Sequence, residues 1–463
     1  MKLKLLTLLA WIVTIQLFGA NYYIAPIGSD ANTGTITNPF ATIQYAVNKA
    51  LPGDIIYLRG GSYQIRTQIN ITVANSGTAA APIKLWAWND EKPLLNFSSQ
   101  PLTKTGDVSL LRGFYITGDY WHLKGFEIYA AADNGIKIEG NHNIIERLVI
   151  HHCGDSGIQL GFGHTTNQNN PYNLCAYNTI LNCDAYRNYD YDNYGSDADG
   201  FACKMHNGKG NVFYGCRAWE NADDAWDLFE TDWPVGIYYC WAWHSGDKTF
   251  FLDWHKTRTG FATSSFQGNG NGIKLGGDGA GGQSKGTHVI GHCISFNNNK
   301  TSSVKGFDHN SHKGGILLYH CLGWNNGYNF MFETAAASGS KNVFVNNVSI
   351  NGLRNDIEIV PGSTEMNNSW NLPAIKAGTD DYLDLSEEAA KAPRQTDGSL
   401  PQNGFARLTK GSDLIDKGKI IDSIAYTGSL PDLGPFEAMI VTDLEVSSEY
   451  EETAKISGYP NPG

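Results

Sequence analysis

Short runs that alternate apolar and polar residues recur along the middle of the chain. Asn211-Val-Phe-Tyr and Thr287-His-Val-Ile are two of them, and turns rich in Gly and Asn separate successive runs. A period of two residues is typical of a β-strand that buries one of its faces. The pattern therefore predicts many short strands joined by tight turns.

The runs belong to a repeat that is marked by cysteine. One Cys stands in each copy, an aromatic residue follows three places later, and Asn or Ser follows five places later. The cysteines are Cys183, Cys216, Cys240, Cys293 and Cys321, the aromatic residues Tyr186, Trp219, Trp243, Phe296 and Trp324, and the polar residues Asn188, Asn221, Ser245, Asn298 and Asn326. Asn347 opens a weaker copy with Ile350 in the aromatic position. The cysteine spacings are 33, 24, 53 and 28 residues, and we interpret 53 as about two ordinary repeats.

Irregular repeats of this size predict a parallel β-solenoid in which each repeat forms one coil. A single coil cannot bury its apolar side, so neighbouring coils stack and share one core. The Cys, aromatic and Asn positions would then form ladders along the stack. We therefore expect an all-β fold, a parallel β-helix.

Both ends of such a stack must be covered, because an open end invites aggregation. Residues Pro39 to Leu51 have helical periodicity, with Phe40, Ile43 and Val47 on one face. We predict that this segment is an N-terminal capping helix. Residues 380–435 lose the ladder, and we expect them to wrap the last coils.

The first 20 residues have the features of a signal peptide. Lys2 and Lys4 precede an apolar run from Leu5 to Phe18, and small residues follow up to Ala20. We predict cleavage near Ala20, a solenoid domain over residues 21–437 and an acidic tail over residues 438–463. No later stretch is long and apolar enough to span a membrane. The ending Tyr459-Pro-Asn-Pro resembles the start of a type IX secretion sorting domain, so we expect a bacterial protein that is secreted or held at the cell surface.

The net charge bears on the partners of the chain, and the positions of the cysteines bear on whether it forms disulfides. The net charge is −12, which argues against nucleic acid, because phosphate binding needs a basic face. Eight Cys in an exported chain could form disulfides. One Cys per coil at a constant position instead indicates small buried apolar side chains. Cys153, Cys175 and Cys203 lie off the ladder, and their pairing stays open.

Four acidic residues fall within two adjacent coils: Asp199, Asp223, Asp224 and Asp227. Each alone is better explained as a turn residue. Carboxylates gathered on one wall are costly unless a cation lies among them, and Ca²⁺ prefers oxygen ligands. We therefore predict that these four residues form a calcium site.

Lys274 is the candidate base. Ile273 and Leu275 flank it, so Lys274 points out of the coil if they point into the core. It follows Asp227 by 47 residues, which we interpret as about two coils. An ordinary surface Lys is the simpler alternative, but a Lys beside a bound divalent cation can serve as a base. Lys305, Asp308 and His309 are candidate residues of a substrate groove.

Four segments together resemble polysaccharide lyase family 9, over about residues 22–437. They read Asp-Gly-Phe, Gly-Asn-Val-Phe-Tyr-Gly-Cys-Arg-Ala-Trp, Asp-Asp-Ala-Trp-Asp and Asn-Gly-Ile-Lys-Leu-Gly-Gly. The resemblance implies a right-handed parallel β-helix and calcium-dependent β-elimination of pectic polymers. It places the metal-binding Asp residues at Asp199, Asp223, Asp224 and Asp227, and the base at Lys274.

The function predicted is a secreted, calcium-dependent lyase that cleaves galacturonate-containing pectate. A rhamnogalacturonan I lyase with the same mechanism is one alternative. A hydrolase similar to polygalacturonases is another, although the Asn-Thr-Asp and Arg-Ile-Lys motifs of that family are missing. The third is a solenoid that binds glycans without catalysis. As partner we expect pectic polysaccharide, with neither nucleic acid nor a membrane span, and we expect a monomer.

Overall fold

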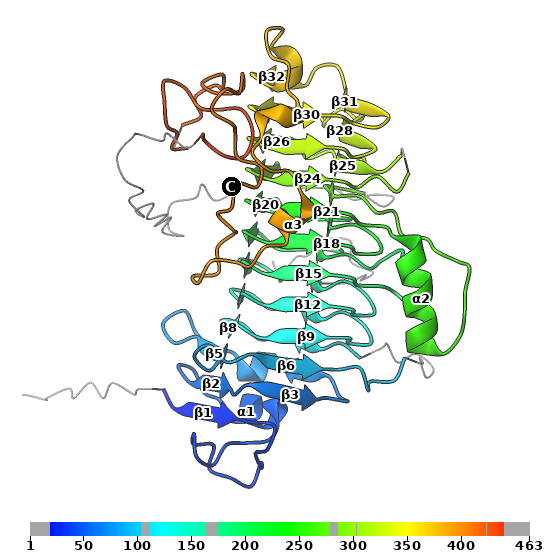
Figure 1. Ribbon diagram of the computed structural model, residues 1–463. Helices are drawn as coiled ribbons and strands as arrows, with labels where there is room; N and C mark the ends of the chain where they lie inside the picture. Colours follow the sequence, from blue (N-terminus) through cyan, green and yellow to red (C-terminus); the bar gives the residue numbers. More distant parts are fainter. Residues whose placement is uncertain are drawn as a thin grey trace, which may run out of the picture.

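The computed structural model describes residues 19–102, 111–162, 174–277, 286–301, 303–422 and 424–438. In this part of the chain, the strands stack into three long sheets that share one axis (Figure 1). All but the last two residues of the expected signal peptide, and all but the first residue of the expected tail, lie outside the described residues. Both segments therefore remain predictions.

Within the described residues, sheet A has twelve strands and sheets B and C have ten each. Sheet A contains β1 (Asn21–Ile24), β2 (Ile55–Leu58), β5 (Ile83–Ala87), β8 (Trp121–Lys124), β11 (Ile144–Glu146), β14 (Thr179–Leu181), β17 (Asn211–Tyr214), β20 (Val235–Tyr238), β23 (His288–Gly291), β26 (Ile316–Tyr319), β29 (Asn342–Val345) and β32 (Thr364–Met366). Sheet B contains β3 (Gly61–Gln64), β6 (Pro93–Asn96), β9 (Glu127–Tyr129), β12 (Val149–His151), β15 (Asp184–Tyr186), β18 (Arg217–Trp219), β21 (Trp241–Trp243), β24 (Ile294–Phe296), β27 (Leu322–Trp324) and β30 (Val348–Ile350). Sheet C contains β4 (Ile69–Ile71), β7 (Phe114–Ile116), β10 (Ile136–Ile138), β13 (Ile158–Leu160), β16 (Phe201–Cys203), β19 (Trp226–Asp227), β22 (Ile273–Lys274), β25 (Lys305–Asp308), β28 (Tyr328–Phe332) and β31 (Asn355–Ile359).

Each coil contributes one strand to each sheet, and neighbouring strands pair in parallel, as between β16 and β19 or between β18 and β21. Inward side chains from all three sheets form a single apolar core along the axis. A parallel strand that carries its apolar residues inward has nothing to pair with inside its own coil, so stacking supplies both its hydrogen bonds and its burial. The predicted parallel β-helix is confirmed.

The predicted ladders are present in register. Tyr186, Trp219, Trp243, Phe296 and Trp324 are successive partners on the outer face of sheet B, and Ile350 follows them. Their neighbouring rings stack with centroids 4.1–5.3 Å apart. The Asn ladder is bonded along the axis, since Asn188 Nδ2 donates to Asn221 Oδ1 at 2.9 Å and Asn298 Nδ2 donates to Asn326 Oδ1 at 3.0 Å.

The interpretation of the 53-residue spacing as two coils was wrong. Trp243 and Phe296 are direct neighbours, so the spacing is one coil that carries an insertion. The insertion lies between β21 and β22 and contains helix α2 (Lys248–Thr259). Asp247 caps its first turn, and Gly260 ends it in the left-handed conformation. For the same reason Asp227 and Lys274 are one coil apart rather than two.

The remaining helices are short. Helix α1 (Ile43–Lys49) lies within the segment that was predicted as helical, and its Ile43, Ala46 and Val47 join the core. The helix is confirmed, while its action as a cap remains a prediction. The 3₁₀ helices are η1 (Val73–Asn75), η2 (Ser369–Asn371) and η3 (Thr379–Asp381), and a four-residue helix α3 (Glu387–Ala390) follows.

All eight cysteines are buried and free, including Cys153, Cys175 and Cys203. The structure thus supports the interpretation of these residues as small buried side chains. On the outer face of sheet B, residues from Tyr382 to Leu433 pack against Trp241, Trp243 and Trp324. This C-terminal segment runs back along the stack beside β18 and β21, further than the last coils (Figure 1).

None of the helices in the described ranges is long and apolar enough to cross a membrane.

Candidate active site

One outward-facing column of sheet C carries the candidate base. In this column Ala202, Asp227, Lys274 and Asp308 are successive partners on four adjacent coils. The residues beside them in the same strands point inward: Trp226, Ile273 and Phe307 are fully buried in the core. The alternation predicted around Lys274 is therefore observed, and Lys274 points out of the coil next to Asp227.

The other three acidic residues lie in the turns that lead into sheet C. Asp199 precedes β16, and Asp223 and Asp224 precede β19. The Asp224 N–H donates to Asp199 Oδ1 at 3.2 Å, which ties the two turns together. Gly200 is required there, because a Cβ on it would lie 2.6 Å from the Ala218 side chain. The turns can therefore approach closely enough to bring their carboxylates to one side of β19.

Three of the four carboxylates meet. Asp199, Asp224 and Asp227 each place one oxygen within 4.8 Å of the others, and all three residues are buried. Asp223 is buried beside them but offers no oxygen to this group among the described residues. Its Oδ1 accepts a hydrogen bond from the Asn269 N–H at 2.6 Å. The fourth predicted ligand is thus a neighbour of the cluster rather than a member of it.

Two lysines face the three carboxylates. Lys274 Nζ lies 3.1 Å from Asp224 Oδ2 and 3.1 Å from Asp227 Oδ1. Lys204 Nζ lies 2.7 Å from Asp199 Oδ2 and 3.5 Å from Asp227 Oδ2. Lys204 is almost completely buried, with 4% of its side chain exposed, so its charge is committed to the cluster.

Lys204 was not found by the sequence analysis, although a signal existed. It continues the alternation of β16, in which Phe201 and Cys203 point inward. That parity puts Lys204 on the same side as Ala202, whose partner on the next coil is Asp227. The spacing alone did not show which strand pairs with which, because the insertions vary in length.

Hydrogen bonds fix the orientation of the three carboxylates. Ser156 Oγ donates to Asp199 Oδ2 at 3.0 Å, Asn271 Nδ2 donates to Asp224 Oδ1 at 2.8 Å, and the Phe229 N–H donates to Asp227 Oδ1 at 3.1 Å. Asp224 Oδ2 is buried and accepts no hydrogen bond of good geometry, although Lys274 Nζ is close to it. Burial has removed water from this oxygen, and the Lys274 ammonium replaces that hydration only in part.

The pKa values of the cluster are shifted because its carboxylates are buried close to one another. Burial raises the pKa of Asp199 to about 7, against the attraction of Lys204. Burial also raises the pKa of Asp224, and burial together with the charges of Asp224 and Asp199 raises the pKa of Asp223 well above its usual value. For Lys274, burial lowers the pKa, but Asp224 and Asp227 outweigh it, so the pKa lies well above its usual value. Negative charge is thus in surplus here.

The surplus favours a hard cation. The residues offer carboxylate oxygens without nearby thiolates or imidazoles in the group, which is the ligand set of Ca²⁺ or Mg²⁺ rather than of zinc. Asp224 Oδ2 has the Lys274 ammonium beside it but accepts no hydrogen bond of good geometry, so it has room for a further ligand. The three converging aspartates can therefore hold a metal ion.

The predicted groove residues divide into two kinds. Asp308 continues the column beyond Lys274, and Lys305 Nζ lies 3.4 Å from its Oδ2. His309 is buried, and neither of its ring nitrogens has a hydrogen-bond partner. Burial lowers the pKa of His309 to about 4. Lys305 is the most accessible of the three, with 26% of its side chain exposed, whereas Asp308 and His309 are both buried.

Comparison with protein families gives a match over most of the chain. Residues 22–347 match the model described as Pel9A-like, right handed beta helix region. Among curated proteins, pectate lyase L of Dickeya chrysanthemi is 38% identical over 420 residues, 90% of each chain. Pectate lyase L of Paenibacillus polymyxa is 37% identical over 87% of this chain and 84% of its own.

Solved structures agree with this result. A crystal structure of pectate lyase Pel9A has a TM-score of 0.77 and 35% identity, and the match covers 91% of this chain and 97% of that one. A rhamnogalacturonan lyase has a TM-score of 0.69 and 26% identity over 85% of this chain and 97% of its own. The right-handed form of the β-helix, which the resemblance implied, follows from these matches.

Proposed function

Because the chain belongs to the Pel9A-like right-handed β-helix family and is a polysaccharide lyase, we propose that it cleaves pectate by calcium-dependent β-elimination. The observation that carries the proposal is the meeting of Asp199, Asp224 and Asp227 beside Lys274. The hydrolase and the non-catalytic solenoid are less well supported, because the relatives that match most of this chain are named as lyases.

Asp199, Asp224 and Asp227 would hold the metal, with Asp223 next to them as the fourth predicted ligand. When bound, calcium supplies positive charge that balances these carboxylates and attracts the carboxylate of a galacturonate unit. Such a site resolves the apparent conflict between an acidic protein, with a net charge of −12, and an acidic polymer.

Lys274 is the residue that would remove the proton from C5 of the galacturonate. That proton is weakly acidic because it is α to the carboxylate, and its loss places negative charge on the carboxylate oxygens. The C5–H electron pair forms the C4–C5 double bond as the bond between C4 and the glycosidic oxygen breaks. Once the charges of Asp224 and Asp227 are balanced, the ion pairs that hold the proton on Lys274 weaken, and its amine can act as a base.

Lys204 has a different task in this proposal. Its ammonium is buried and bonded to Asp199 at 2.7 Å, so it cannot approach a substrate from outside. It orients Asp199 and offsets one of the surplus charges. Lys274 is more accessible, with 12% of its side chain exposed, which favours it as the base.

A second substrate is supported by a specific observation. The rhamnogalacturonan lyase that matches this chain has nearly the same coverage as pectate lyase Pel9A, although its identity is lower, 26% against 35%. Both polymers present galacturonate to the metal. We propose pectate as the main substrate and rhamnogalacturonan I as the alternative.

The site of action is also a proposal. The basic start and apolar run of residues 1–20 support export, and a polymer of plant cell walls is available only outside the cell. We propose a protein secreted by a bacterium or held at its surface, acting as a monomer.

Ultraviolet absorbance tests the reaction, because elimination leaves a conjugated double bond and hydrolysis does not. Purified protein is incubated with polygalacturonate and with rhamnogalacturonan I, with added calcium and with a chelator. We expect absorbance to rise with polygalacturonate and calcium, and to stay flat with the chelator. Reducing ends that increase without absorbance would contradict the proposal, and so would full activity in the chelator.

A further inference from the structure

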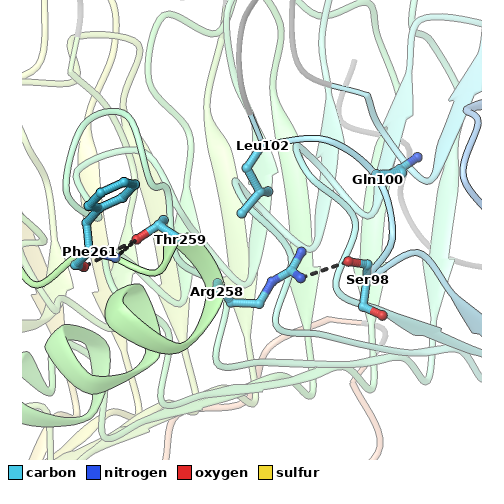
Figure 2. Close-up of a pocket in the computed structure, with 6 residues that line it drawn as sticks. All are labelled: Ser98, Gln100, Leu102, Arg258, Thr259 and Phe261. Atoms are coloured by element: carbon cyan, nitrogen blue, oxygen red, sulfur yellow. Dashed lines mark hydrogen bonds between the residues drawn. The ribbon is translucent and has the colours of Figure 1, made fainter.

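A cavity lies away from the aspartate cluster, between helix α2 and an early coil. It has a volume of about 390 Å³ and is lined by Ser98, Gln100, Leu102, Arg258, Thr259 and Phe261 (Figure 2). Ser98 to Leu102 belong to the turn after β6, whereas Arg258 to Phe261 form the end of α2 and the residues after it. The inserted helix thus builds one wall, and the stack of coils builds the other.

Arg258 brings a positive charge to this cavity. In Figure 2 its side chain extends from α2 towards Ser98. Its Nη1 donates to the Ser98 carbonyl at 2.9 Å, its Nη2 to the Ala130 carbonyl at 3.5 Å, and its Nε to the Tyr191 hydroxyl at 3.4 Å. All three acceptors are neutral. Within the described ranges, no carboxylate forms an ion pair with Arg258, which retains two of its five N–H donors for another acceptor.

Other arginines near this face show how the chain usually balances a guanidinium. Arg187 is paired with Glu220 at 2.6 Å, and Arg217 is paired with Asp184 at 2.8 Å. Arg258 is half-buried, so water screens its charge only in part. A half-buried guanidinium that faces a cavity with free donors is suited to a carboxylate, which it can bind through two parallel hydrogen bonds.

The rim of the cavity adds an apolar surface. Phe261 is 74% exposed, and no other large apolar side chain in the described chain except Ile27 is exposed to that extent. An exposed aromatic ring beside a carboxylate-binding group matches a sugar acid, whose C–H face packs on a ring while its carboxylate is bound. The volume of the cavity also falls within the range of small-molecule sites.

The position of the cavity fits a long polymer that also reaches the aspartate cluster. The turn after β6 leads to β7, and Asp223 and Asp224 lie in the equivalent turn before β19, so both are on the same edge of sheet C. In sheet C, β7 is four steps from β19. Four strand spacings amount to about 19 Å along the axis. Several sugar units are needed to span that distance.

We propose that this cavity is a distal subsite in which Arg258 binds the carboxylate of a uronate unit and Phe261 packs against its ring. The proposal rests on the proposed function for the chemistry of the polymer. It assigns to the α2 insertion a part in holding long chains, whereas bond cleavage takes place at Lys274.

The test compares two lengths of substrate. A galacturonate trimer is too short to join the two sites, and a decamer can join them. We expect Arg258→Gln to raise KM for the decamer about tenfold, as is usual for loss of a charged hydrogen bond. For the trimer, KM of the variant should equal KM of the wild-type protein. Phe261→Ala, which removes an exposed side chain, should raise KM for the decamer about threefold. Equal effects on trimer and decamer would overturn the proposal.

Arg187→Gln is the matched control. The Arg187 guanidinium also packs on α2, 4.9 Å from the Phe250 ring, but it does not line the cavity. If Arg187→Gln raises KM for the decamer as much as Arg258→Gln does, anchoring of α2 explains the effect and the subsite is wrong. Titration calorimetry with the decamer and the Lys274→Ala protein, with and without Arg258→Gln, measures binding directly. A Kd for the decamer that Arg258→Gln leaves unchanged would overturn the subsite. If Arg258→Gln weakens binding of the decamer but the wild-type protein eliminates none of it, only the proposed function is overturned.

Discussion

Two buried clusters of aspartate and basic residues lie on different faces of the β-helix. On sheet B, Asp184 is held by Arg217 and Arg394, and its two oxygens accept four hydrogen bonds of 2.7–3.2 Å from them. On sheet C, three aspartates share Lys204 and Lys274, and Asp224 Oδ2 has only the Lys274 ammonium near it among the described residues. The residue types are similar, but the balance of charge is opposite.

The pKa values follow that balance. Burial alone would raise the pKa of Asp184, but Arg394 and Arg217 lower it to about 2. Burial raises the pKa of Asp199 to about 7 despite Lys204. Asp184 has two arginines for one carboxylate, and both of its oxygens are hydrogen-bonded, so it needs no further partner. The aspartate cluster has more carboxylates than lysines, so a cation from outside the chain would balance it. The comparison therefore separates a structural ion-pair network from a candidate catalytic site.

The largest expected effect comes from Lys274→Ala. Loss of the proposed base should lower the rate of elimination about 10²- to 10⁴-fold. The β-helix should be retained, because Lys274 is not part of its apolar core, although Asp224 and Asp227 each lose an ion pair. Initial rates of absorbance increase on polygalacturonate measure the effect, and circular dichroism checks the fold.

Lys300→Ala is the control for that variant. Lys300 is a half-exposed lysine paired with Asp247 at 3.3 Å, outside the aspartate cluster. Its removal should leave turnover unchanged. A Lys274→Ala protein with normal rates would show that the base has been assigned to the wrong residue.

Arg394→Ala should lower the stability of the protein and leave its turnover unchanged, the reverse of Lys274→Ala. It leaves Asp184 with Arg217 alone, and breaking a buried ion pair costs about 3–5 kcal/mol of unfolding free energy. Turnover of the folded fraction should not change, since Arg394 joins the C-terminal segment to sheet B. Urea unfolding measures the loss.

The neighbouring Lys391→Ala provides the scale for that measurement. Lys391 pairs with Glu220 at 2.7 Å, but 36% of its side chain is exposed, so its removal should cost less than about 1 kcal/mol. Equal losses in the two variants would mean that burial does not distinguish the two ion pairs.

A further effect, smaller than that of Arg394→Ala, depends on pH. Asp190 lies in the same coil as Asp184, but it has no basic partner among the described residues, and its Oδ2 has no hydrogen-bond partner. Burial raises the pKa of Asp190 to about 6. A raised pKa means that the stability due to this group is complete below its ordinary value of 3.8 and is lost as the pH rises to about 6.

Asp190→Asn should remove this loss, because the amide oxygen can still accept the two backbone hydrogen bonds. The unfolding free energy of the variant relative to wild type should therefore rise by about 2 kcal/mol between pH values of about 4 and about 7. Asp184 behaves in the opposite way: its contribution is present above pH 3.8 and is lost as the pH falls towards 2. A variant that differs from wild type equally at both pH values would contradict the raised pKa.

Much of the fold could be predicted from the sequence because a solenoid is nearly one-dimensional. Cys183, Trp219 and Asn298 belong to ladders that repeat with each coil, so local spacing was enough to place them. Trp324 and Ile350 were matched from spacing alone and are partners in the structure. The candidate site residues were selected because four aspartates fall within two coils and because Ile273 and Leu275 flank Lys274, and the family resemblance placed its roles on the same residues. Parity then gave the correct orientation of Lys274.

The sequence by itself determined the parallel β-helix, the outward direction of Lys274 and the acidic character of the wall beside it. Only the tertiary structure decided that the coil containing α2 is a single coil, and hence that Asp227 and Lys274 are direct neighbours. It also decided that Lys204 joins the cluster and that Asp223 stays beside it. The physical reason is that periodicity fixes which way a side chain points within its strand. Which strands become neighbours depends on how long each insertion is and how its turns pack, and no local pattern records that.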